Sequence, residues 1–516
     1  MPDGRSNKLT TMHRLWTISL IAGAAAGAPS EPVRSCETLH ALTLADTAIE
    51  SAAMEPASGE RPAFCRVTAV RTHPPAGDQI RIFIGLPIKN WNGRFMGVGG
   101  GGFSGGNPGA VVMPVAEGYA AASTDTGHAG GRGSFALDAH GRLDWLLIRD
   151  NAYLGIHEMT LTAKAVIEAF YGRSQQHAYF NGCSTGGRQG LSEAQRYPAD
   201  YDGILSGAPA INWTKLHVEQ MWGTVAMQQA GDFPPRCKFE AARTAAIAAC
   251  DAADGVKDGV IEDPRNCHFD PKELVGTAAE GCPAFTDTDA EVIRKIWQGP
   301  RRRDGRFLWY GLPRGADFSG LSATGGTPLA ARPNPITLDW WRYFLTQNPE
   351  WDWSGLTPPL YELYWDQSVE EFSMVLATDN PDLTAFRDHG GRIVLWHGWS
   401  DQLIYPEGTI DYYERVERRM GGAKSTSAFA RLFLAPGVAH CAGGAGPQPE
   451  GAFDAVVRWV EEGQAPETLR AVRHEPGGGV RSRPLCRYPL VAKYKGSGST
   501  DDAANFECKL EPKHDQ

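Results

Sequence analysis

A serine and a histidine that lie far apart in the chain each have a cysteine as direct neighbour. Residues 182–187 read GCSTGG and residues 439–442 read AHCA. If Ser184 and His440 meet in the folded chain, a hydrogen bond of about 3 Å between their side chains brings Cys183 and Cys441 within reach of a disulfide. This is a strong constraint on the fold, because two distant segments must then arrive at one place.

The surroundings of Ser184 favour a nucleophile. Residues 177–181 read as a strand that leads into the serine, and residues 188–196 read as a helix that follows it. A Gly-x-Ser-x-Gly segment between a strand and a helix is typical of a sharp turn that exposes the serine side chain. The helix N-terminus and the backbone N–H of Thr185 then lie where they can stabilise an oxyanion. A glycine-rich turn without a nucleophile is the alternative interpretation.

Candidates for the acid and the base follow the serine in the chain. A serine needs a base to remove its proton, and the base needs an acid to orient it. Asp401 comes just after a predicted strand over residues 392–396, and His440 comes just after one over residues 430–434. Loops at the carboxyl ends of parallel strands are where such residues belong. The order serine, acid, histidine is also the expected one.

Asp125 and His128 are rivals for the same two roles. They also follow a predicted strand, at residues 118–123, but they precede the serine and so have the wrong order. We expect them to support the site, with triad membership as the alternative.

A run of glycines supplies a candidate for the second oxyanion donor. Residues 99–102 are all glycine and follow a short apolar strand over residues 93–98. Such a loop commonly donates a backbone N–H to the oxyanion in hydrolases with a Gly-x-Ser-x-Gly turn. Gly100, Gly101 and Gly102 are all candidates for this donor, and we assign the role to Gly101. A flexible turn would give the same sequence.

The order of elements predicts the α/β class. Strands at residues 79–86, 93–98, 118–123 and 203–206 alternate with an apolar helical pattern at residues 152–171. This alternation indicates a mostly parallel sheet with helices on both faces. From residue 209 to 387 the chain is instead rich in proline, glycine and aromatic residues. We interpret residues 209–387 as an inserted domain, between residues 29–208 and 388–516 of the catalytic domain.

The N-terminus and the cysteines predict export. Residues 1–14 are polar and basic, and residues 15–28 are apolar and end in small residues, as in a secretory signal peptide. Met12 is an alternative start. Ten cysteines downstream of such a signal indicate disulfides in an oxidising compartment, so the protein is expected to be secreted or periplasmic.

Charge and hydropathy limit the partners that we expect. A formal net charge of −10 argues against a nucleic-acid partner. No later run is long and apolar enough for a membrane span, so no membrane partner is expected either. A small-molecule substrate remains, and the oligomeric state is open.

The combination of Cys183-Ser184, Asp401 and His440-Cys441 resembles the tannase and feruloyl esterase family. This family also includes hydrolases of mono(2-hydroxyethyl) terephthalate. The resemblance extends from about Cys36 to Cys508. It implies a secreted α/β-hydrolase with a large lid inserted between the serine and the aspartate, which cleaves esters of aromatic acids. It assigns Ser184 as nucleophile, Asp401 as acid and His440 as base, bridged by Cys183–Cys441.

The resemblance also implies a structural calcium ion in the inserted domain. Its ligands would be the carboxylates of Asp251, Asp254 and Asp258 and the backbone carbonyls of Val256 and Val260. Carboxylates in a glycine-rich loop suit a hard cation. Composition alone would equally allow Asp-Gly turns without a metal.

Disulfides follow from the same resemblance. It implies Cys250–Cys267 around the acidic loop, with Cys36–Cys65 and Cys486–Cys508 near the two ends of the chain. Once the resemblance has assigned the other pairs, Cys237 and Cys282 remain and would pair with each other by elimination. Relatives often have a small disulfide loop after the calcium segment, and here its expected early partner is not a cysteine.

The substrate contacts are less constrained by the sequence. Trp399 and Ile404 flank Asp401 and are predicted to contact the substrate. Seven tryptophans between residues 297 and 365 could form the wall of an aryl pocket or the core of the inserted domain. We expect a serine carboxylesterase of the feruloyl esterase or tannase type. The alternatives are a hydrolase of terephthalate-type aryl monoesters and a catalytically silent binding protein.

Overall fold

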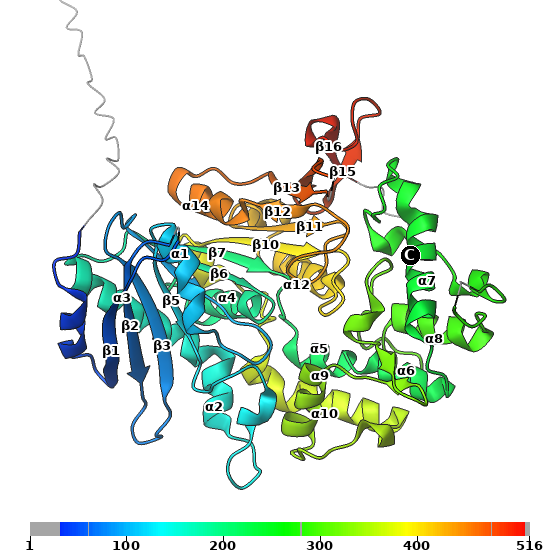
Figure 1. The fold of residues 1–516 in the computed structure, drawn as a ribbon, viewed down its shortest axis with the longest axis horizontal. Helices are drawn as coiled ribbons and strands as arrows, with labels where there is room; N and C mark the ends of the chain where they lie inside the picture. Colours follow the sequence, from blue (N-terminus) through cyan, green and yellow to red (C-terminus); the bar gives the residue numbers. More distant parts are fainter. Residues whose placement is uncertain (1–30, 60, 279–280, 476, 511–516) are drawn as a thin grey trace, which may run out of the picture.

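A nine-stranded sheet forms the centre of the computed structural model, which describes residues 31–59, 61–278, 281–475 and 477–510 (Figure 1). The strand order is β1-β2-β3-β5-β4-β6-β7-β10-β11. Neighbours from β5 to β11 pair in parallel, whereas β1, β2 and β3 extend one edge in antiparallel fashion. The strands are β1 (Thr47–Glu55), β2 (Phe64–Arg71), β3 (Ile80–Pro87), β4 (Arg94–Val98), β5 (Ala120–Thr124), β6 (His177–Cys183), β7 (Gly203–Gly207), β10 (Arg392–Gly398) and β11 (Ala430–Ala435).

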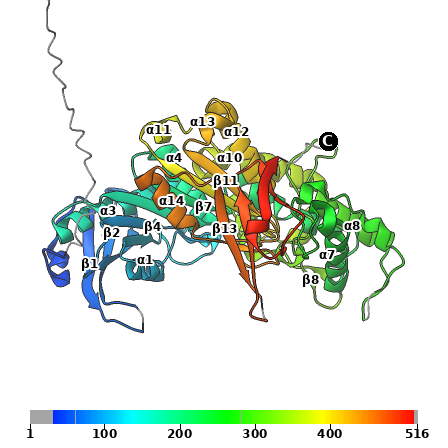
Figure 2. The same ribbon diagram turned by 90° about the horizontal axis from the view of Figure 1, so that it is seen from above.

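Helices cover both faces of this sheet. Phe180 and Leu432 enter one hydrophobic core together with residues of α3, α4 and α12. Their chain neighbours Tyr179 and Phe433 enter another core with residues of α14. Successive side chains of a strand point to opposite faces, so the two cores lie on opposite sides of the sheet. In Figure 2, α12 and α1 lie on opposite sides. The helices outside the insert are α1 (Val112–Ala116), α2 (Trp145–Arg149), α3 (Gly155–Tyr171), α4 (Thr185–Arg196), α12 (Pro406–Arg419), α13 (Ala423–Thr426) and α14 (Ala452–Glu462).

Residues 209–387 leave the sheet after β7 and return to it at β10, and we call them the insert. The insert contributes no strand to the nine-stranded sheet, and its own short strands pair with each other. In Figure 1 most of it lies on the right, coloured green to yellow. Its elements are α5 (Trp213–Glu219), α6 (Trp222–Ala230), α7 (Arg236–Cys250), α8 (Asp287–Gln298), β8 (Thr324–Gly325), β9 (Ala330–Ala331), α9 (Pro335–Asp339), α10 (Pro358–Leu376) and α11 (Thr384–Asp388).

The end of the chain forms two small sheets beside β11. The first contains β12 (Gln448–Glu450), β13 (Thr468–His474) and β14 (Val480–Cys486), and the second contains β15 (Leu490–Tyr494) and β16 (Phe506–Leu510). Val256 of the insert packs in one cluster with residues of these last strands, so the end of the chain contacts the insert.

Five disulfides join the ten cysteines, and the described residues contain no free cysteine. The pairing agrees with the expectation at every bridge, including the pair that the resemblance left undefined. The bridges are Cys36–Cys65, Cys183–Cys441, Cys237–Cys282, Cys250–Cys267 and Cys486–Cys508.

The predicted strands and helices of the catalytic region are present. The strand predicted at residues 392–396 is β10, and the helix predicted at 152–171 is α3, preceded by a π-helical turn over Asp150–Leu154. The sheet is more mixed than expected, because the sequence analysis did not predict β1 and β2. The proposed signal peptide, residues 1–28, lies outside the described residues.

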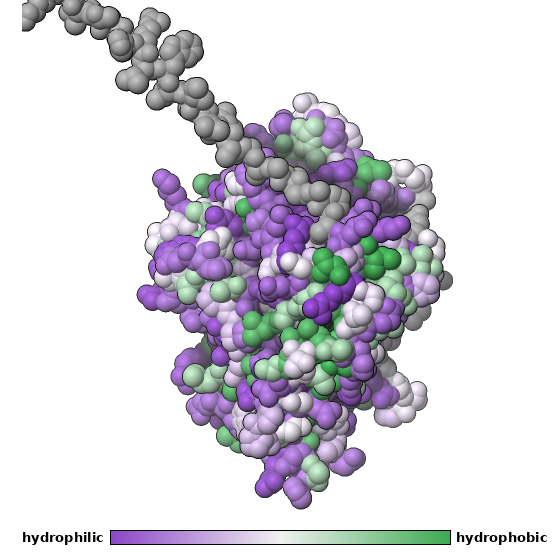
Figure 3. All heavy atoms as spheres, turned by 90° about the vertical axis from the view of Figure 1, so that its left-hand side faces the viewer, coloured by the Kyte–Doolittle hydropathy of each residue, from purple (hydrophilic) through white to green (hydrophobic). Residues whose placement is uncertain are grey.

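The surface near β1 and α3 is mainly hydrophilic, with hydrophobic residues gathered towards its middle (Figure 3). Within the part of the chain that the structure describes, no helix combines the length and the apolar character that crossing a bilayer requires.

Candidate active site

Ser184 occupies a sharp turn between β6 and α4. Its backbone has a φ of 62° and a ψ of −124°, a region that non-glycine residues rarely adopt and that costs about 1–3 kcal/mol. The turn also needs glycine on both sides. A Cβ atom at Gly182 would lie 2.4 Å from the backbone of Gly186, and one at Gly187 would lie 2.5 Å from the carbonyl oxygen of Gly207. The structure therefore has the strand–turn–helix context that was predicted for a nucleophile.

The glycine loop after β4 lies directly against this turn. Gly186 donates its N–H to the carbonyl oxygen of Gly100 at 3.0 Å, and the Thr185 hydroxyl donates to that of Gly102 at 2.5 Å. The N–H of Gly100 binds the Gln189 side chain at 2.9 Å, so it has an acceptor already. Gly100 is thereby excluded as the free oxyanion donor.

Two backbone N–H groups remain available at this place. Thr185 is the first residue of α4, so its N–H has no acceptor within the helix. Within the described ranges, no hydrogen bond outside the regular elements uses the N–H of Thr185 or Gly101. A Cβ atom added at Gly101 would face open space, whereas one at Gly102 would lie 3.1 Å from Ile336. This arrangement favours Gly101 as the partner of Thr185.

Asp401 and His440 lie side by side in the loops after β10 and β11. The Nδ1 atom of His440 is 2.8 Å from Oδ2 of Asp401. The other oxygen, Oδ1, accepts the backbone N–H groups of Leu403 at 2.8 Å and Ile404 at 2.9 Å. Gln402 accepts the backbone N–H of His440 at 3.1 Å and so fixes the histidine loop. The predicted acid and base therefore form a pair.

Cys183–Cys441 connects this pair to the serine. The two Cα atoms are 5.9 Å apart across a sequence separation of 258 residues. Within the described chain, no hydrogen bond of 3.5 Å or less joins the Ser184 hydroxyl to His440. Catalytic hydrogen bonds are often long before a substrate binds. The bridge nevertheless makes the serine turn and the histidine loop direct neighbours.

The electrostatics of the pair suit a base and its orienting acid. Burial alone would raise the pKa of Asp401, but the charge of His440 and hydrogen bonds from His397 and His440 hold that pKa well below its usual range. Burial alone would lower the pKa of His440, but the charge and the hydrogen bond of Asp401 raise it above its ordinary value. Asp401 therefore stays ionised beside His440.

Asp125 and His128 do not contact this pair. Asp125 accepts backbone N–H groups of Arg81 at 2.9 Å and Gly127 at 2.8 Å, as a turn-forming carboxylate does. His128 lies 3.2 Å from the amide of Asn151, and burial lowers its pKa to about 4. The same amide donates to the carbonyl oxygen of Phe103, directly after the glycine loop. His128 is thus linked through Asn151 to the segment after the glycine loop, whereas the contacts of Asp125 stay with β3 and its own turn.

Trp399 and Ile404 have different surroundings. Trp399 is buried, and its ring lies under the guanidinium of Arg265 at 5.0 Å. It lines a cavity with residues of the acidic loop and of β14, and no member of the proposed triad lines that cavity. Ile404 lines a smaller cavity together with Leu216 and Trp309 of the insert. No member of the proposed triad lines this second cavity either, and Ile404 differs from Trp399 in that it faces the insert.

The tryptophans of the insert lie mainly in its core. Trp340 and Trp341 have no exposed surface, and Trp297, Trp309 and Trp365 are also buried. Phe344 joins this cluster to the active site, because it stacks on Trp340 at 4.4 Å and on Phe103 at 5.5 Å. Of the two interpretations left open by the sequence, the core of the insert fits these residues.

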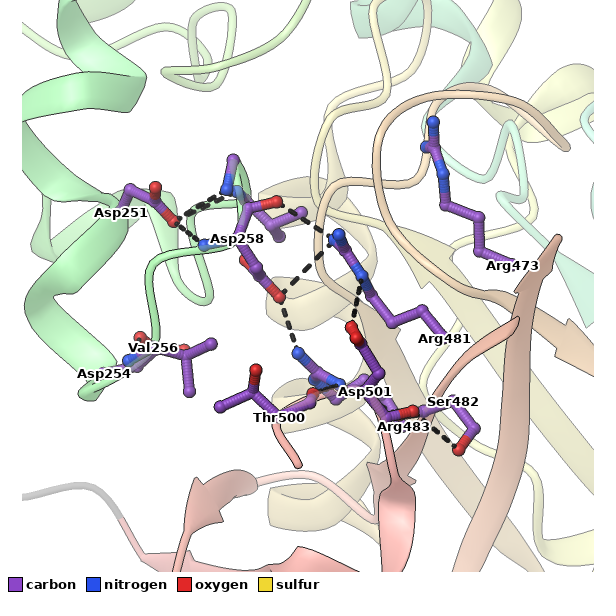
Figure 4. A network of polar contacts seen from close by, with 12 residues as sticks. Asp251, Asp254, Val256, Asp258, Arg473, Arg481, Ser482, Arg483, Thr500 and Asp501 are labelled. Atoms are coloured by element: carbon purple, nitrogen blue, oxygen red, sulfur yellow. Dashed lines mark hydrogen bonds and ion pairs between the residues drawn. The ribbon is translucent and has the colours of Figure 1, made fainter. Parts of the chain in front are cut away.

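Figure 4 shows the acidic loop with Asp251, Asp254, Val256 and Asp258. Oδ1 of Asp251 accepts the backbone N–H groups of residues 258, 259 and 260 at 2.9, 3.0 and 3.3 Å. Oδ1 of Asp254 accepts the N–H of Val256 at 2.9 Å. Besides Asp258, the expected ligand set contains the carboxylates of Asp251 and Asp254 and the carbonyl oxygens of Val256 and Val260. These four groups fit calcium as oxygen donors.

Asp258 has a different partner from the one expected. Its Oδ2 lies 2.6 Å from the guanidinium of Arg483 and 3.7 Å from that of Arg481, both on β14. Arg481 also donates to the backbone carbonyl of Asp258 at 3.0 Å. One carboxylate of the expected ligand set is therefore paired with arginines from the end of the chain (Figure 4).

Sequence reasoning missed three residues that shape the site. His397 and Gln402 both flank Asp401 in the segment HGWSDQ, and each binds a member of the Asp401–His440 pair. Gln189 lies on α4 and binds both ends of the glycine loop, at Gly100 and Gly105. Their positions next to predicted site residues could have indicated them. The directions of their side chains cannot be read from the sequence.

The comparison with protein families decides the identity of the fold and its chemistry. Residues 65–509 match the family model described as "Tannase and feruloyl esterase". The chain belongs to this family. It is accordingly a carboxylic ester hydrolase.

Relatives of known name agree with this family. A probable feruloyl esterase of Arthroderma benhamiae is 41% identical over 460 residues, which cover 86% of this chain and 85% of that protein. The mono(2-hydroxyethyl) terephthalate hydrolase of Piscinibacter sakaiensis is 31% identical over 507 residues, covering 84% and 82%. Tannase family relatives therefore match nearly the whole chain.

Solved structures extend the agreement to three dimensions. Feruloyl esterase B from Aspergillus oryzae has a TM-score of 0.80 at 27% identity, with 92% of this chain and 99% of that chain covered. Tannin acyl hydrolase from Aspergillus niger has a TM-score of 0.82 at 27% identity, with 91% and 92% covered. The insert and the C-terminal sheets are thus part of the tannase-family architecture.

Proposed function

We propose that this tannase-family protein is an exported serine esterase that hydrolyses esters of phenolic acids through an acyl-enzyme on Ser184. Family membership and relatives named feruloyl esterases support the reaction and the substrate class. The observation that carries the mechanism is the bridge Cys183–Cys441, which joins the serine turn to a histidine that binds a buried aspartate.

The first half of the reaction forms the acyl-enzyme. His440 takes the proton of the Ser184 hydroxyl while Oγ attacks the carbonyl carbon of the ester. The carbonyl oxygen becomes an oxyanion, which receives the N–H groups of Thr185 and Gly101. The tetrahedral intermediate collapses, the C–O bond to the alcohol breaks, and the alcohol leaves with the proton from His440.

The second half releases the acid. A water molecule gives a proton to His440 and attacks the acyl carbon, which forms a second oxyanion in the same place. Collapse returns the proton to Ser184 Oγ and frees the carboxylic acid. Throughout, Asp401 accepts the hydrogen bond of Nδ1 and so keeps Nε2 directed at the reacting atoms, and its charge stabilises the imidazolium.

The insert acts as the lid of this site in our proposal. Ile336 of the insert lies within 3.1 Å of a Cβ position at Gly102, and Trp309 and Leu216 share a cavity with Ile404. These contacts place insert side chains over the glycine loop and beside the loop of Asp401. An aromatic acyl group would then bind between the two domains.

A second candidate substrate is an aryl monoester of the terephthalate type. The relative from Piscinibacter sakaiensis, named as a hydrolase of mono(2-hydroxyethyl) terephthalate, favours it. The chemistry at Ser184 is the same for both candidates. Only the group that the insert must accommodate differs.

We further propose a structural calcium ion in the acidic loop and export from the cytoplasm. The oxygen chemistry of Asp251, Asp254, Val256 and Val260 supports the ion, which would hold the loop in its turn. Five disulfides support an oxidising compartment, either outside the cell or in a periplasm.

A hydrolysis panel tests the proposed function. The purified protein is given methyl gallate, methyl ferulate, chlorogenate and mono(2-hydroxyethyl) terephthalate, and kcat/KM ranks them. Ser184→Ala is expected to lower kcat by at least about 10⁴-fold on the best substrate. Ser192→Ala is the matched control, because this hydroxyl lies on the same helix and has no hydrogen-bond partner in the described chain. Equal turnover by Ser184→Ala and the parent protein would disprove the mechanism and leave the silent binding protein as the interpretation.

A further inference from the structure

A second histidine binds the carboxylate of Asp401. The Nε2 atom of His397 lies 3.1 Å from Oδ2 of Asp401, the same oxygen that binds His440. It also lies 2.9 Å from the carbonyl oxygen of Ile404. His397 and Asp401 are both completely buried. Asp401 thus receives four donors, two from the backbone and two from histidines.

The surroundings of His397 define which of its nitrogens carries hydrogen. Nε2 faces two oxygen acceptors, so it must be a donor. Nδ1 lies 2.9 Å from the hydroxyl of Thr409 on α12. A hydroxyl can donate to this nitrogen, which selects the tautomer with hydrogen on Nε2. Thr409 therefore donates to His397, and His397 and His440 both donate to the same oxygen of Asp401.

This chain of contacts has a consequence for the base. Two donors on one oxygen share its negative charge, so each receives less of it than a single donor would. His397 therefore moderates the attraction of Asp401 for the proton of His440. His397 also fixes the plane of the Asp401 carboxylate. The hydrogen bonds to Oδ1 alone would leave the carboxylate freer to rotate about its Cβ–Cγ bond.

We infer that His397, oriented by Thr409, is a positioning residue for Asp401 that sets the basicity of His440. The inference rests on the proposed roles of Asp401 and His440. His397 touches neither substrate nor the reacting atoms, and it acts only through Asp401. Thr409 and Ile404 both line the cavity shared with Trp309 of the insert, so the outer end of this chain lies where the insert meets the catalytic domain.

Other titratable groups lie nearby and must be separated from this effect. Burial raises the pKa of the Tyr405 hydroxyl well above its ordinary range, so Tyr405 stays neutral near neutral pH. Burial also raises the pKa of Glu219 of α5 well above its ordinary range, so Glu219→Gln belongs in the experiment as a control. Burial raises the pKa of Glu407, at the start of α12, to about 7. Glu407→Gln therefore belongs in the experiment, because a limb in the pH profile near neutrality could come from this residue.

The test compares His397→Met with His397→Gln. Methionine fills a similar volume and offers no donor, whereas the glutamine amide keeps an N–H donor for Asp401 and for the Ile404 carbonyl. We expect His397→Met to lower kcat by about ten- to a hundredfold, as loss of a hydrogen bond to a charged group does. We expect KM to change by less than about threefold and the acid limb of the kcat profile to move to higher pH. His397→Gln should restore most of kcat and the limb.

Thr409→Val and His389→Met complete the set. Thr409→Val removes the hydroxyl that selects the tautomer and should change kcat and the acid limb in the same direction as His397→Met, by a smaller factor. His389 is exposed, just before β10, and its replacement should change neither quantity. If His397→Met and His397→Gln lose kcat equally with an unmoved acid limb, His397 is a packing residue and the inference is wrong.

Proton NMR provides a readout that does not need turnover. The downfield ring N–H resonances of His440 and His397 report the ionisation of His440 directly. His397→Met should remove one resonance and move the titration of the other to higher pH, whereas Glu407→Gln should leave the titration in place. An unmoved titration overturns the inference even if no ester is hydrolysed. Failure of the proposed function appears separately, as equal rates for the parent protein and Ser184→Ala.

Discussion

The loop of Asp401 and the loop of Asp258 have much in common. Both carry a carboxylate that the sequence singles out, and a disulfide lies beside each. They differ in the origin of the donors. Three of the four donors to Asp401 come from residues 397–404, within seven residues of one another. The Asp258 side chain accepts a hydrogen bond from Arg483 and forms an ion pair with Arg481, both from the far end of the chain.

The difference shows when a sequence motif is sufficient to identify the role of a carboxylate. A carboxylate that is held by its own loop keeps the role that its motif indicates. A carboxylate that meets a partner from another part of the chain acquires a second role that its motif does not show. The following experiments test this contrast, starting with the largest expected effect.

Asp401→Asn tests the carboxylate that is held by its own loop. We expect kcat to fall by about 10⁴-fold, because an amide favours the wrong histidine tautomer. The charge of Asp401 raises the pKa of His440, and activity requires neutral His440, so activity falls as the pH drops through that raised pKa. Without the charge, the acid limb of the residual activity should move to lower pH. A kcat–pH profile measures both.

Asp125→Asn is the control for that variant. Asp125 is also held by its own turn, but it does not contact His440. Its replacement should leave the acid limb in place and lower kcat far less. If instead Asp125→Asn lowered kcat by about 10⁴-fold and Asp401→Asn lowered it only slightly, Asp125 would be the orienting acid.

Removal of the disulfides compares the two loops in stability. Cys183–Cys441 closes a separation of 258 residues, and the chain-entropy model gives about 5.5 kcal/mol for it. Cys250–Cys267 closes a separation of 17 residues, for which the model gives about 3 kcal/mol. Replacing both cysteines of a bridge by serine should therefore lower the urea concentration at the midpoint of unfolding. The decrease should be larger for Cys183–Cys441 than for Cys250–Cys267. Only the first should also lower kcat in native buffer, since only it joins catalytic loops.

Arg483→Met tests the other side of the comparison. Loss of this partner should destabilise the calcium-free protein by about 2 kcal/mol, because Asp258 is left largely buried without a charged hydrogen bond. The same change should strengthen calcium binding about fivefold or more, because a positive charge beside the loop is removed. Thermal unfolding with calcium and with EGTA, together with terbium luminescence, measures the two effects.

Arg473→Met is the matched control. Arg473 lies on the neighbouring strand β13, apart from Asp258 (Figure 4). Its guanidinium donates to the carbonyl oxygen of Gly444 at 2.7 Å. Arg473→Met removes the same positive charge as Arg483→Met, but the arginine that it replaces does not contact Asp258. If the two variants respond equally to EGTA, the arginine pairing of Asp258 has no connection with the metal loop.

Much of the catalytic region could be predicted from the sequence. Strands such as β6 and β10 are short apolar runs with a chemical motif directly after them, so pattern and motif support each other. Strand β1 could not be found in this way. Its residues TAIESAAME are mostly exposed or half-buried, so the strand has neither a continuous apolar run nor a regular alternation.

The site shows the same division between pattern and environment. The serine, the acid and the histidine follow from order and context. Trp399 and Ile404 both lie within three residues of Asp401 in sequence, yet one packs under Arg265 and the other faces the insert. Only the conformation of the loop distinguishes them. The pairing of Asp258 with Arg483 depends on how the C-terminal strands pack against the insert, for which no local pattern exists.

The place at which the insert joins the sheet has a consequence for how such enzymes diversify. Strands β7 and β10 are adjacent and pair in register from Gly203–Arg392 to Gly207–Trp396, although residues 209–387 separate them in the chain. The sheet therefore needs the insert only to cross from the carboxyl end of β7 to the amino end of β10, at the opposite edge of the sheet. Evolution or an engineer can lengthen, shorten or exchange this segment as a cassette. The catalytic residues would keep their positions while the range of accepted esters changes.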